Sequence, residues 1–230
     1  MIQAQETARK QGKIRFAGVS THTAPAIVDR VIETKRDVML MSYNFTMDQA
    51  NTDAIDKAKA AGIGVVAMKV MAGGKRRIKP GDKLAGIFQR DGAMLSALKW
   101  VLKNPKVDAT VPSMTDMDQL DDNLTAMTAP FTDADGKLLA GYLDHIRPSY
   151  CRMCFRCEGT CPKGLPVADM LRFLMYADDY GQFGLGRQHF LALPEQTAAI
   201  RCGDCSICAV NCPNGVRVAE RLIRAQELFA

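Results

Sequence analysis

The segment that best defines this chain is Cys151-Arg152-Met153-Cys154-Phe155-Arg156-Cys157-Glu158-Gly159-Thr160-Cys161-Pro162. A second segment repeats its pattern, Cys202-Gly203-Asp204-Cys205-Ser206-Ile207-Cys208-Ala209-Val210-Asn211-Cys212-Pro213. Both segments follow C-x2-C-x2-C-x3-C-P, and together they hold all 8 cysteines of the chain. Two runs of four cysteines at one spacing predict two sites at which thiolates bind metal.

This spacing is the one with which bacterial ferredoxins bind [4Fe–4S] clusters, and the fourth cysteine of each run then ligates the other cluster. On that rule the ligands of one cluster are Cys151, Cys154, Cys157 and Cys212. The ligands of the other cluster are Cys202, Cys205, Cys208 and Cys161. We therefore predict two [4Fe–4S] clusters close enough to exchange electrons. We expect an apolar shell around them from Ile200, Ile207, Val210 and Val216.

Zinc and disulfides are the alternatives for these cysteines. Structural zinc prefers paired C-x2-C knuckles to four cysteines in one short run. Disulfides need an oxidising compartment, and the sequence carries no signal for one. Both alternatives remain open, but the spacing favours iron–sulfur clusters over either of them.

The net charge of the chain argues against a nucleic-acid-binding protein. The formal charge is +5, but this value counts every cysteine as neutral. A four-iron core with four thiolates carries roughly −2, so two clusters bring the total from +5 to about +1. The basic residues beside the cysteine runs are expected either to offset cluster charge or to be solvated; they are Arg152, Arg156, Lys163, Arg201 and Arg217.

Neither a membrane span nor a secretory signal is evident in the sequence. No stretch reaches the roughly 18 consecutive apolar residues that a span requires. The first ten residues are polar and helix-prone, without the charged and then apolar pattern of a signal peptide. We therefore expect a cytoplasmic protein without membrane spans.

Strand and helix signals alternate over the first 128 residues, as in a parallel sheet covered by helices. Short apolar runs predict strands at 14–19, 38–41, 63–68 and 107–111. Helical patterns are expected at 3–11, after Pro25, and at 50–61, 94–102 and 116–127, the last with an aspartate cap. Later elements are a turn at Asp135-Gly136, helices at 137–146, from Pro166 and at 216–229, and a loop at Gly181, Gly184 and Gly186. The histidines His145 and His189 would then lie in a linker and a loop.

The strand regions carry a family resemblance. Residues 12–20, Gly-Lys-Ile-Arg-Phe-Ala-Gly-Val-Ser, resemble the GKIRxxGVS strand of aldo/keto reductases. Residues 37–44, 62–69, and 111–112 with 122–124 resemble the next three strand regions, in family order. The cysteine-containing part is similar to that of aldo/keto reductases with a ferredoxin-type extension. The resemblance implies an α/β fold, a partial TIM barrel of the second four βα units at 1–130. A linker at 131–148 and a mainly α, ferredoxin-type two-cluster domain at 149–230 would follow.

The same resemblance implies part of a nicotinamide site. It places Ser20 near the nicotinamide amide, Met71, Gly73 and Gly74 near the pyrophosphate, and Asp122 and Asn123 near the adenine. The choice between NAD(H) and NADP(H) stays open, because Ser113 and Gln119 stand where the family's 2′-phosphate-binding lysine and arginine would be. The family's catalytic tyrosine, lysine, aspartate and histidine come from the first four strand units, so we assign no catalytic residue.

Three functional hypotheses follow. The favoured one is an iron–sulfur oxidoreductase module in which two clusters transfer electrons to or from an attached barrel. A second is a carbonyl reductase that is active only with a missing N-terminal half barrel, and a third gives the clusters a purely structural role. The expected partners are a redox protein, the missing half barrel, or a second copy of the chain bound through the open half barrel.

Overall fold

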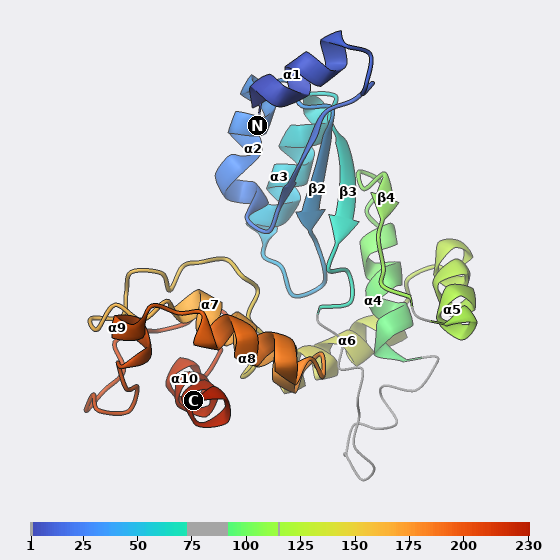
Figure 1. Ribbon diagram of the computed structural model, residues 1–230. Helices are drawn as coiled ribbons and strands as arrows, with labels where there is room; N and C mark the ends of the chain where they lie inside the picture. Colours follow the sequence, from blue (N-terminus) through green and yellow to red (C-terminus); the bar gives the residue numbers. More distant parts are fainter. Residues whose placement is uncertain (1, 73–91, 115) are drawn as a thin grey trace. The chain divides into compact units, whose positions relative to one another are not determined.

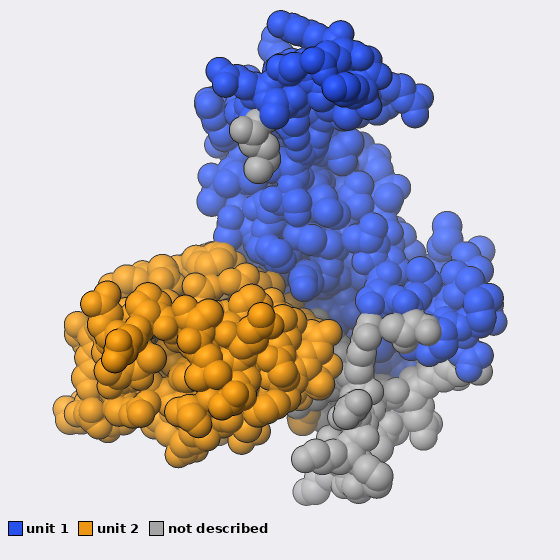
Figure 2. Space-filling view, in the orientation of Figure 1, with its two compact units in different colours: residues 1–72, 87–139 blue, residues 73–86, 140–230 orange. Residues whose placement is uncertain are grey.

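The computed structural model describes residues 2–72, 92–114 and 116–230, so Gly73 and Gly74 lie outside the described residues. The chain divides into two compact units (Figure 2). The first comprises Met1–Ala72 and Ile87–Leu139, and the second comprises Gly73–Gly86 and Ala140–Ala230. The boundary at 139–140 falls inside the segment expected to be a linker.

The first unit contains a parallel sheet in the part of the chain that the structure describes (Figure 1). Its strands are β1 (Gly18–Thr21), β2 (Val38–Ser42), β3 (Gly64–Met68) and β4 (Ala109–Thr110), in the order β1-β2-β3-β4. Each predicted strand is present, although β1 begins later than expected and β4 is only 2 residues long. The four parallel βα units confirm the predicted partial barrel.

Five helices accompany these strands among the described residues: α1 (Ile2–Lys10), α2 (Ala24–Glu33), α3 (Gln49–Ala60), α4 (Ala93–Leu102) and α5 (Met117–Thr128). The predicted cap of α5 is confirmed, since the Asp116 side chain accepts a hydrogen bond from Gln119 N at 2.9 Å. This bond satisfies one of the amide groups that a helix N-terminus leaves free.

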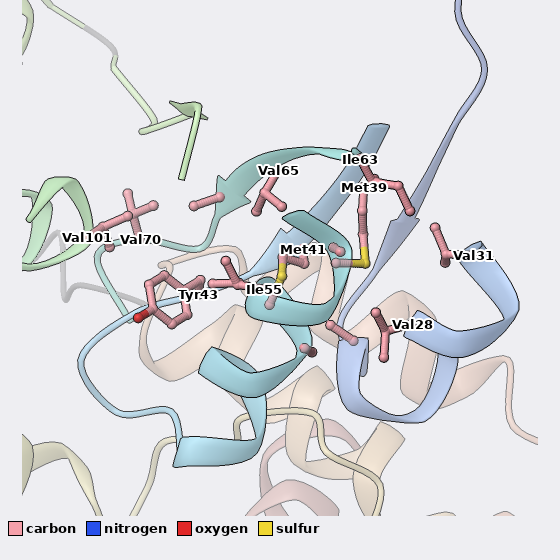
Figure 3. Close-up of a cluster of buried hydrophobic side chains, with 14 of the residues drawn as sticks. Val28, Val31, Met39, Met41, Tyr43, Ile55, Ile63, Val65, Val70 and Val101 are labelled. Carbon is pink, nitrogen blue, oxygen red and sulfur yellow. The ribbon is translucent and has the colours of Figure 1, made fainter. Parts of the chain in front are cut away.

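The core of the first unit follows from side-chain alternation along the strands. Met39 and Met41 of β2 and Val65 of β3 are fully buried and pack with α2 and α3 residues such as Val28 and Ile55 (Figure 3). Full burial of one such side chain stabilises the fold by about 1.5–3 kcal/mol. The alternate strand residues point to the other face of the sheet. Of these, Val38, Leu40 and Val66 are only partly buried.

The first three helices end in the same way, with a residue in the left-handed backbone conformation. These residues are Gly12 (φ 71°), Lys35 (φ 50°) and Gly62 (φ 75°). After Lys35, the Arg36 amide donates to Val31 O at 3.2 Å, which satisfies a carbonyl at the end of α2. The chain is thereby turned from each helix towards the next strand.

The second unit is helical in its described residues. After α6 (Asp133–Ile146), whose residues fall partly in each unit, it contains α7 (Val167–Asp178), α8 (Phe183–Leu191), α9 (Glu195–Ala198) and α10 (Val218–Phe229). Its core includes Leu171 and Leu174 of α7 and Leu222 and Phe229 of α10. No described helix is both long and apolar enough to cross a membrane.

The expected turn at Asp135-Gly136 is wrong, because both residues lie within α6. Thr132 and Asp135 cap this helix reciprocally. Thr132 N donates to the Asp135 carboxylate at 2.7 Å, and Asp135 N donates to Thr132 Oγ1 at 3.3 Å. This arrangement is a capping box, which starts a helix where the glycine pattern suggested a turn. His145 accordingly lies in α6 and not in a linker.

The expected glycine loop is confirmed only at Gly181, which lies in the bend between α7 and α8; it is wrong for Gly184 and Gly186, which lie within α8. Gly186 permits close packing of α8 on α7. A Cβ atom at this position would lie 2.5 Å from Phe173 O and 2.9 Å from the Phe229 ring. His189 is part of the same helix, and its ring stacks on Phe173 with the ring centroids 5.3 Å apart.

Candidate iron–sulfur site

The first cysteine run forms an irregular loop between α6 and α7. Cys151 and Cys157 are buried, at 8% and 9% exposure. Met153 and Phe155, on either side of Cys154, have positive φ values of 54° and 57°. Such a conformation costs a non-glycine residue roughly 1–2 kcal/mol. The loop therefore accepts backbone strain to curve around its cysteines, and Met153 N donates a hydrogen bond to Cys151 Sγ at 3.4 Å.

The structure brings the last cysteine of the second run to this loop. The Cys151 thiol interacts electrostatically with Cys157, Cys154 and Cys212, and Cys157 interacts with Cys154 and Cys212. Cys212 therefore lies within electrostatic range of the first run. This grouping is the one that the ferredoxin rule predicts for the first cluster.

The reciprocal group forms around the second run. Cys202 interacts electrostatically with Cys208, Cys161 and Cys205, so the last cysteine of the first run lies with the second run. This group is more accessible than the first, because Cys205 and Cys208 are both exposed. In both groups the fourth cysteine of one run thus lies within electrostatic range of the other run, and the ligand assignment stays a prediction.

Gln226 of α10 holds the second loop, a role that the sequence does not reveal. Its side chain is 6% exposed. The amide oxygen accepts from Cys202 N at 2.8 Å, and the amide nitrogen donates to Ile200 O at 2.6 Å. A buried amide that bonds the backbone on both sides of Arg201 fixes the start of the loop. The only sequence signal is a glutamine on the apolar side of a helical pattern.

Burial raises the pKa of three of the cysteine thiols. Burial, together with the neighbouring cysteines, raises the pKa of Cys151 to about 12, against one hydrogen bond from Met153 N that lowers it. Burial also raises the pKa of Cys157 and of Cys202. In the metal-free chain these groups are neutral thiols at pH 7, so binding of iron must release their protons.

The donor set fits iron–sulfur clusters. All eight cysteines are free thiols. In the described ranges, no three His, Cys, Asp or Glu side chains converge as ligands of one metal ion. The thiolates of a cubane need not converge on one metal ion, because each of the four binds a different iron, so a looser grouping of the thiols is compatible with a cluster. When bound, a cluster of this type would accept and release single electrons.

A repeat longer than the cysteine pattern surrounds both sites. Each fourth cysteine begins the pattern C-P-x-G-x-x-V-A, which the sequence shows at 161–168 and again at 212–219. Gly164 and Gly215 have φ values of 76° and 85°, and each donates its amide to the carbonyl of the preceding fourth cysteine, at 2.9 and 3.0 Å. A 12-residue helix follows in each case, α7 and α10. The two halves of the site therefore share one local architecture.

The predicted apolar shell is only partly present. Val210 and Val216 are buried, at 8% and 6% exposure, and Ile200 is partly buried. The expectation for Ile207 is wrong, because its side chain is 84% exposed. Ile207 lies between Cys205 and Cys208, in a bend of the second loop.

Of the residues expected to bind a nicotinamide cofactor, the described ones, Ser20, Met71, Asp122 and Asn123, lie in the first unit. Ser20 is exposed near the carboxyl end of β1, and Met71 follows the same end of β3 and packs against the core. Asp122 and Asn123 are partly buried in α5. The Asn123 Nδ2 atom is buried and has no hydrogen-bond partner among the described residues.

Comparison with known protein families identifies the first unit. The model of the aldo/keto reductase family matches residues 1–143 of the 230. The chain belongs to the aldo/keto reductase family. In this family member a second model, the 4Fe-4S dicluster domain, matches residues 150–217. Both resemblances stated from the sequence are thereby confirmed, and iron–sulfur oxidoreductase is the kind of function that the two domains support.

Solved aldo/keto reductases are similar to only part of the chain. The aldo-keto reductase AKR11C1 from Bacillus halodurans matches in its apo form with 20% identity and a TM-score of 0.46, over 61% of this chain and 55% of that one. The holo form matches with the same identity and TM-score over 54% of its length. The chain thus spans about half the length of these family members. No curated protein matches the sequence.

Proposed function

We propose that the second unit is a two-cluster electron-transfer module of an aldo/keto-reductase-like oxidoreductase. The observation that supports this proposal is that Cys212 interacts electrostatically with the first run and Cys161 with the second. The eight cysteines of the two runs would hold two [4Fe–4S] clusters, which would supply one-electron chemistry between a redox partner and the attached barrel.

The residues of this chain hold the two sites at a fixed separation. Because each site needs a thiolate from both runs, neither loop can move independently of the other. Gln226 fixes the second loop to α10, and the buried Val210 and Val216 supply the apolar part of the surroundings. Fixed loops with partly apolar surroundings favour electron transfer over iron loss.

Cysteine substitutions in pairs test the reciprocal grouping. The anaerobically purified chain should contain about eight iron and eight sulfide ions. Cys154→Ala should halve the iron content. Adding Cys212→Ser should remove no further iron, because both residues serve one cluster, whereas adding Cys161→Ser should remove the remainder. Equal losses in the two double variants would contradict the grouping, and stoichiometric zinc in place of iron would contradict the function.

We also propose that the first unit contributes half of a nicotinamide site. The contributing residues of this unit would be Ser20, Met71, Asp122 and Asn123, and the adjoining Gly73 and Gly74, which lie outside the described residues, would complete the expected set. The buried, unpartnered amide of Asn123 supports this role, because an adenine nitrogen is a suitable acceptor for it. We expect carbonyl reduction with NADH or NADPH only after the other half barrel is supplied. Turnover by this chain alone would refute that requirement.

The partner of the first unit would cover the open side of the sheet. Val38, Leu40 and Val66 are partly buried on that side, and β1 and β4 leave two strand edges unpaired within the described sheet. We propose pairing with the other half barrel or with a second copy of this chain. Sedimentation of the chain should show self-association, or a complex once the half barrel is added. A stable monomer under both conditions, well above micromolar concentration, would refute the proposal.

A further inference from the structure

The residue between Cys-Pro and Gly in the repeated pattern differs between the two halves of the site. It is Asn214 after Cys212-Pro213, and Lys163 after Cys161-Pro162. The surrounding backbone is the same in both copies, with a positive-φ glycine next in the chain. The two side chains therefore start from equivalent positions but carry different chemistry.

Asn214 reaches a cysteine of the other run. Its Nδ2 atom lies 3.4 Å from Cys154 Sγ. An amide N–H is a donor, whereas the amide oxygen would be repelled by an electron-rich sulfur, so the orientation with nitrogen towards sulfur is the chemically required one. Cys154 shares its site with the buried Cys151 and Cys157. An amide donor therefore faces the more buried of the two cysteine groups.

Lys163 reaches across in the opposite direction. Its Nζ atom lies 3.1 Å from Arg201 O and 3.4 Å from the Asp204 carboxylate, and these two residues flank Cys202 and Gly203. The ammonium group thus stands beside the loop that carries the exposed Cys205 and Cys208. Asp204 offsets part of its charge, and the carboxylate is itself largely exposed, at 68%.

A hydrogen bond to a cluster sulfur and a nearby positive charge both raise the reduction potential of the cluster. The reduced cluster carries one more negative charge than the oxidised cluster, so a donor or cation beside it stabilises the reduced form. Asn214 and Lys163 should each raise the potential of the cluster that they face. The lysine effect should be the smaller one, because Asp204 and solvent screen its charge.

We propose that Asn214 and Lys163 are positioning residues that set the two cluster potentials separately. Asn214 acts on the cluster of Cys151, Cys154, Cys157 and Cys212, and Lys163 acts on the cluster of Cys202, Cys205, Cys208 and Cys161. This inference rests on the proposed function, since it requires that both clusters be present. The repeat supplies two equivalent positions, and the residue at each one distinguishes otherwise similar sites.

Redox titration of the holo-protein, followed by electron paramagnetic resonance, tests the inference. Asn214→Ala should lower the reduction potential of the cluster that Asn214 faces by about 59 mV. This shift corresponds to about a tenfold change in the equilibrium constant of one-electron reduction. Asn214→Asp, which keeps the shape but replaces the donor with a negative charge, should lower it further. Lys163→Ala should lower the potential of the other cluster by less, and Asn211→Ala, an exposed asparagine in the second run, should change neither.

Single-cluster variants assign each shift to its cluster. Cys205→Ala should leave only the cluster that Asn214 faces, and Cys154→Ala only the cluster that Lys163 faces. If these variants do not fold, the two resonances of the intact protein provide the same comparison. The inference would be overturned if neither Asn214→Ala nor Lys163→Ala changed a cluster potential. It would also be overturned if one of these substitutions shifted both cluster potentials equally. Purified protein without iron and sulfide would instead overturn the proposed function together with it.

Discussion

Asp135 shows how strongly one buried carboxylate can hold the first unit together. It is 9% exposed, and Lys99 Nζ donates to it at 2.6 Å. Ser96 Oγ and both the amide and the hydroxyl of Thr132 donate at 2.7 Å. Burial opposes ionisation of this carboxyl, but these four donors outweigh it and hold the pKa of Asp135 well below its ordinary value.

Replacing Asp135 by asparagine should destabilise the protein and change its response to acid. Asp135→Asn leaves Lys99 buried without its counter-ion, which should cost about 3 kcal/mol. Because the folded pKa lies below the unfolded value of about 3.9, the carboxylate contributes fully above that pH and loses its contribution as pH falls further. The variant should therefore lose less stability than the wild type as pH falls below about 5, measured by urea unfolding.

Asp133→Asn is the matched control, because Asp133 is an exposed acid in the first turn of the same helix. It should change the free energy of unfolding by less than about 1 kcal/mol. Identical acid responses of wild type and Asp135→Asn would contradict the role given to this carboxylate.

At this scale the sequence identifies the groups with unusual chemistry but not the groups that orient them. The eight cysteines and their spacing predicted the clusters, because thiolate ligation imposes a strict local pattern. Asn214 and Gln226 escaped prediction, because each reaches a residue far along the chain, 60 residues away for Asn214 and 24 for Gln226. Such contacts depend on the folded arrangement and leave no local pattern.

At the level of secondary structure, glycine residues determine where two of the helices end and how closely another helix can pack. Gly12 and Gly62 terminate α1 and α3 in the left-handed conformation, whereas α2 uses Lys35 for the same purpose. The strands of the first unit were predictable from short apolar runs. The helix α8 was not, because glycine inside a helix costs about 1 kcal/mol and normally indicates a loop. The close approach of Gly186 to Phe173 explains why the residue is retained there.

Lys35→Gly should stabilise the protein by about 0.5–1 kcal/mol, because glycine adopts a φ of 50° without the clash that a side chain meets. Lys35 is exposed, so little packing is lost. The free energy of unfolding in urea measures the gain. Gly62→Ala is the converse control: its Cβ would meet nothing within 4 Å, so its expected loss of about 1 kcal/mol would come from the backbone alone. A destabilised Lys35→Gly variant would contradict this interpretation.

Gly186→Ala should destabilise the second unit by about 1–3 kcal/mol, because the new methyl group would collide with a backbone carbonyl of α7. The better helix propensity of alanine offsets only about 1 kcal/mol of that cost. Gly184→Ala in the same helix meets nothing within 4 Å and should instead be neutral or stabilising. Thermal unfolding of the two holo-proteins provides the comparison, and an equal effect of both substitutions would show that packing of α8 on α7 is not tight.

The whole molecule consists of two units with different sources of stability. The first has a continuous apolar core between its sheet and helices. The second packs α7, α8 and α10 together, but its two cysteine loops have little regular structure of their own. Their conformation depends on what the thiolates bind, because metal binding and folding are coupled in such sites.

Removal of iron should therefore unfold the cysteine loops while the first unit remains folded. After treatment with a chelator under reducing conditions, amide hydrogen exchange should accelerate in residues 150–217 and change little in β2 and β3. Mass spectrometry of proteolytic peptides resolves the two regions. Equal acceleration in both regions would show that the units unfold as one.

The exchange of Cys161 and Cys212 between the runs also has a consequence for biosynthesis. With the proposed ligand sets, the first cluster would not be completed until Cys212 had left the ribosome, and the second would wait for Cys208. Neither site would be filled while the first run alone was exposed, although that run is made some fifty residues earlier. Under this assignment neither ligand set is complete before both runs have been translated, and a chain interrupted before Cys208 carries two incomplete ligand sets.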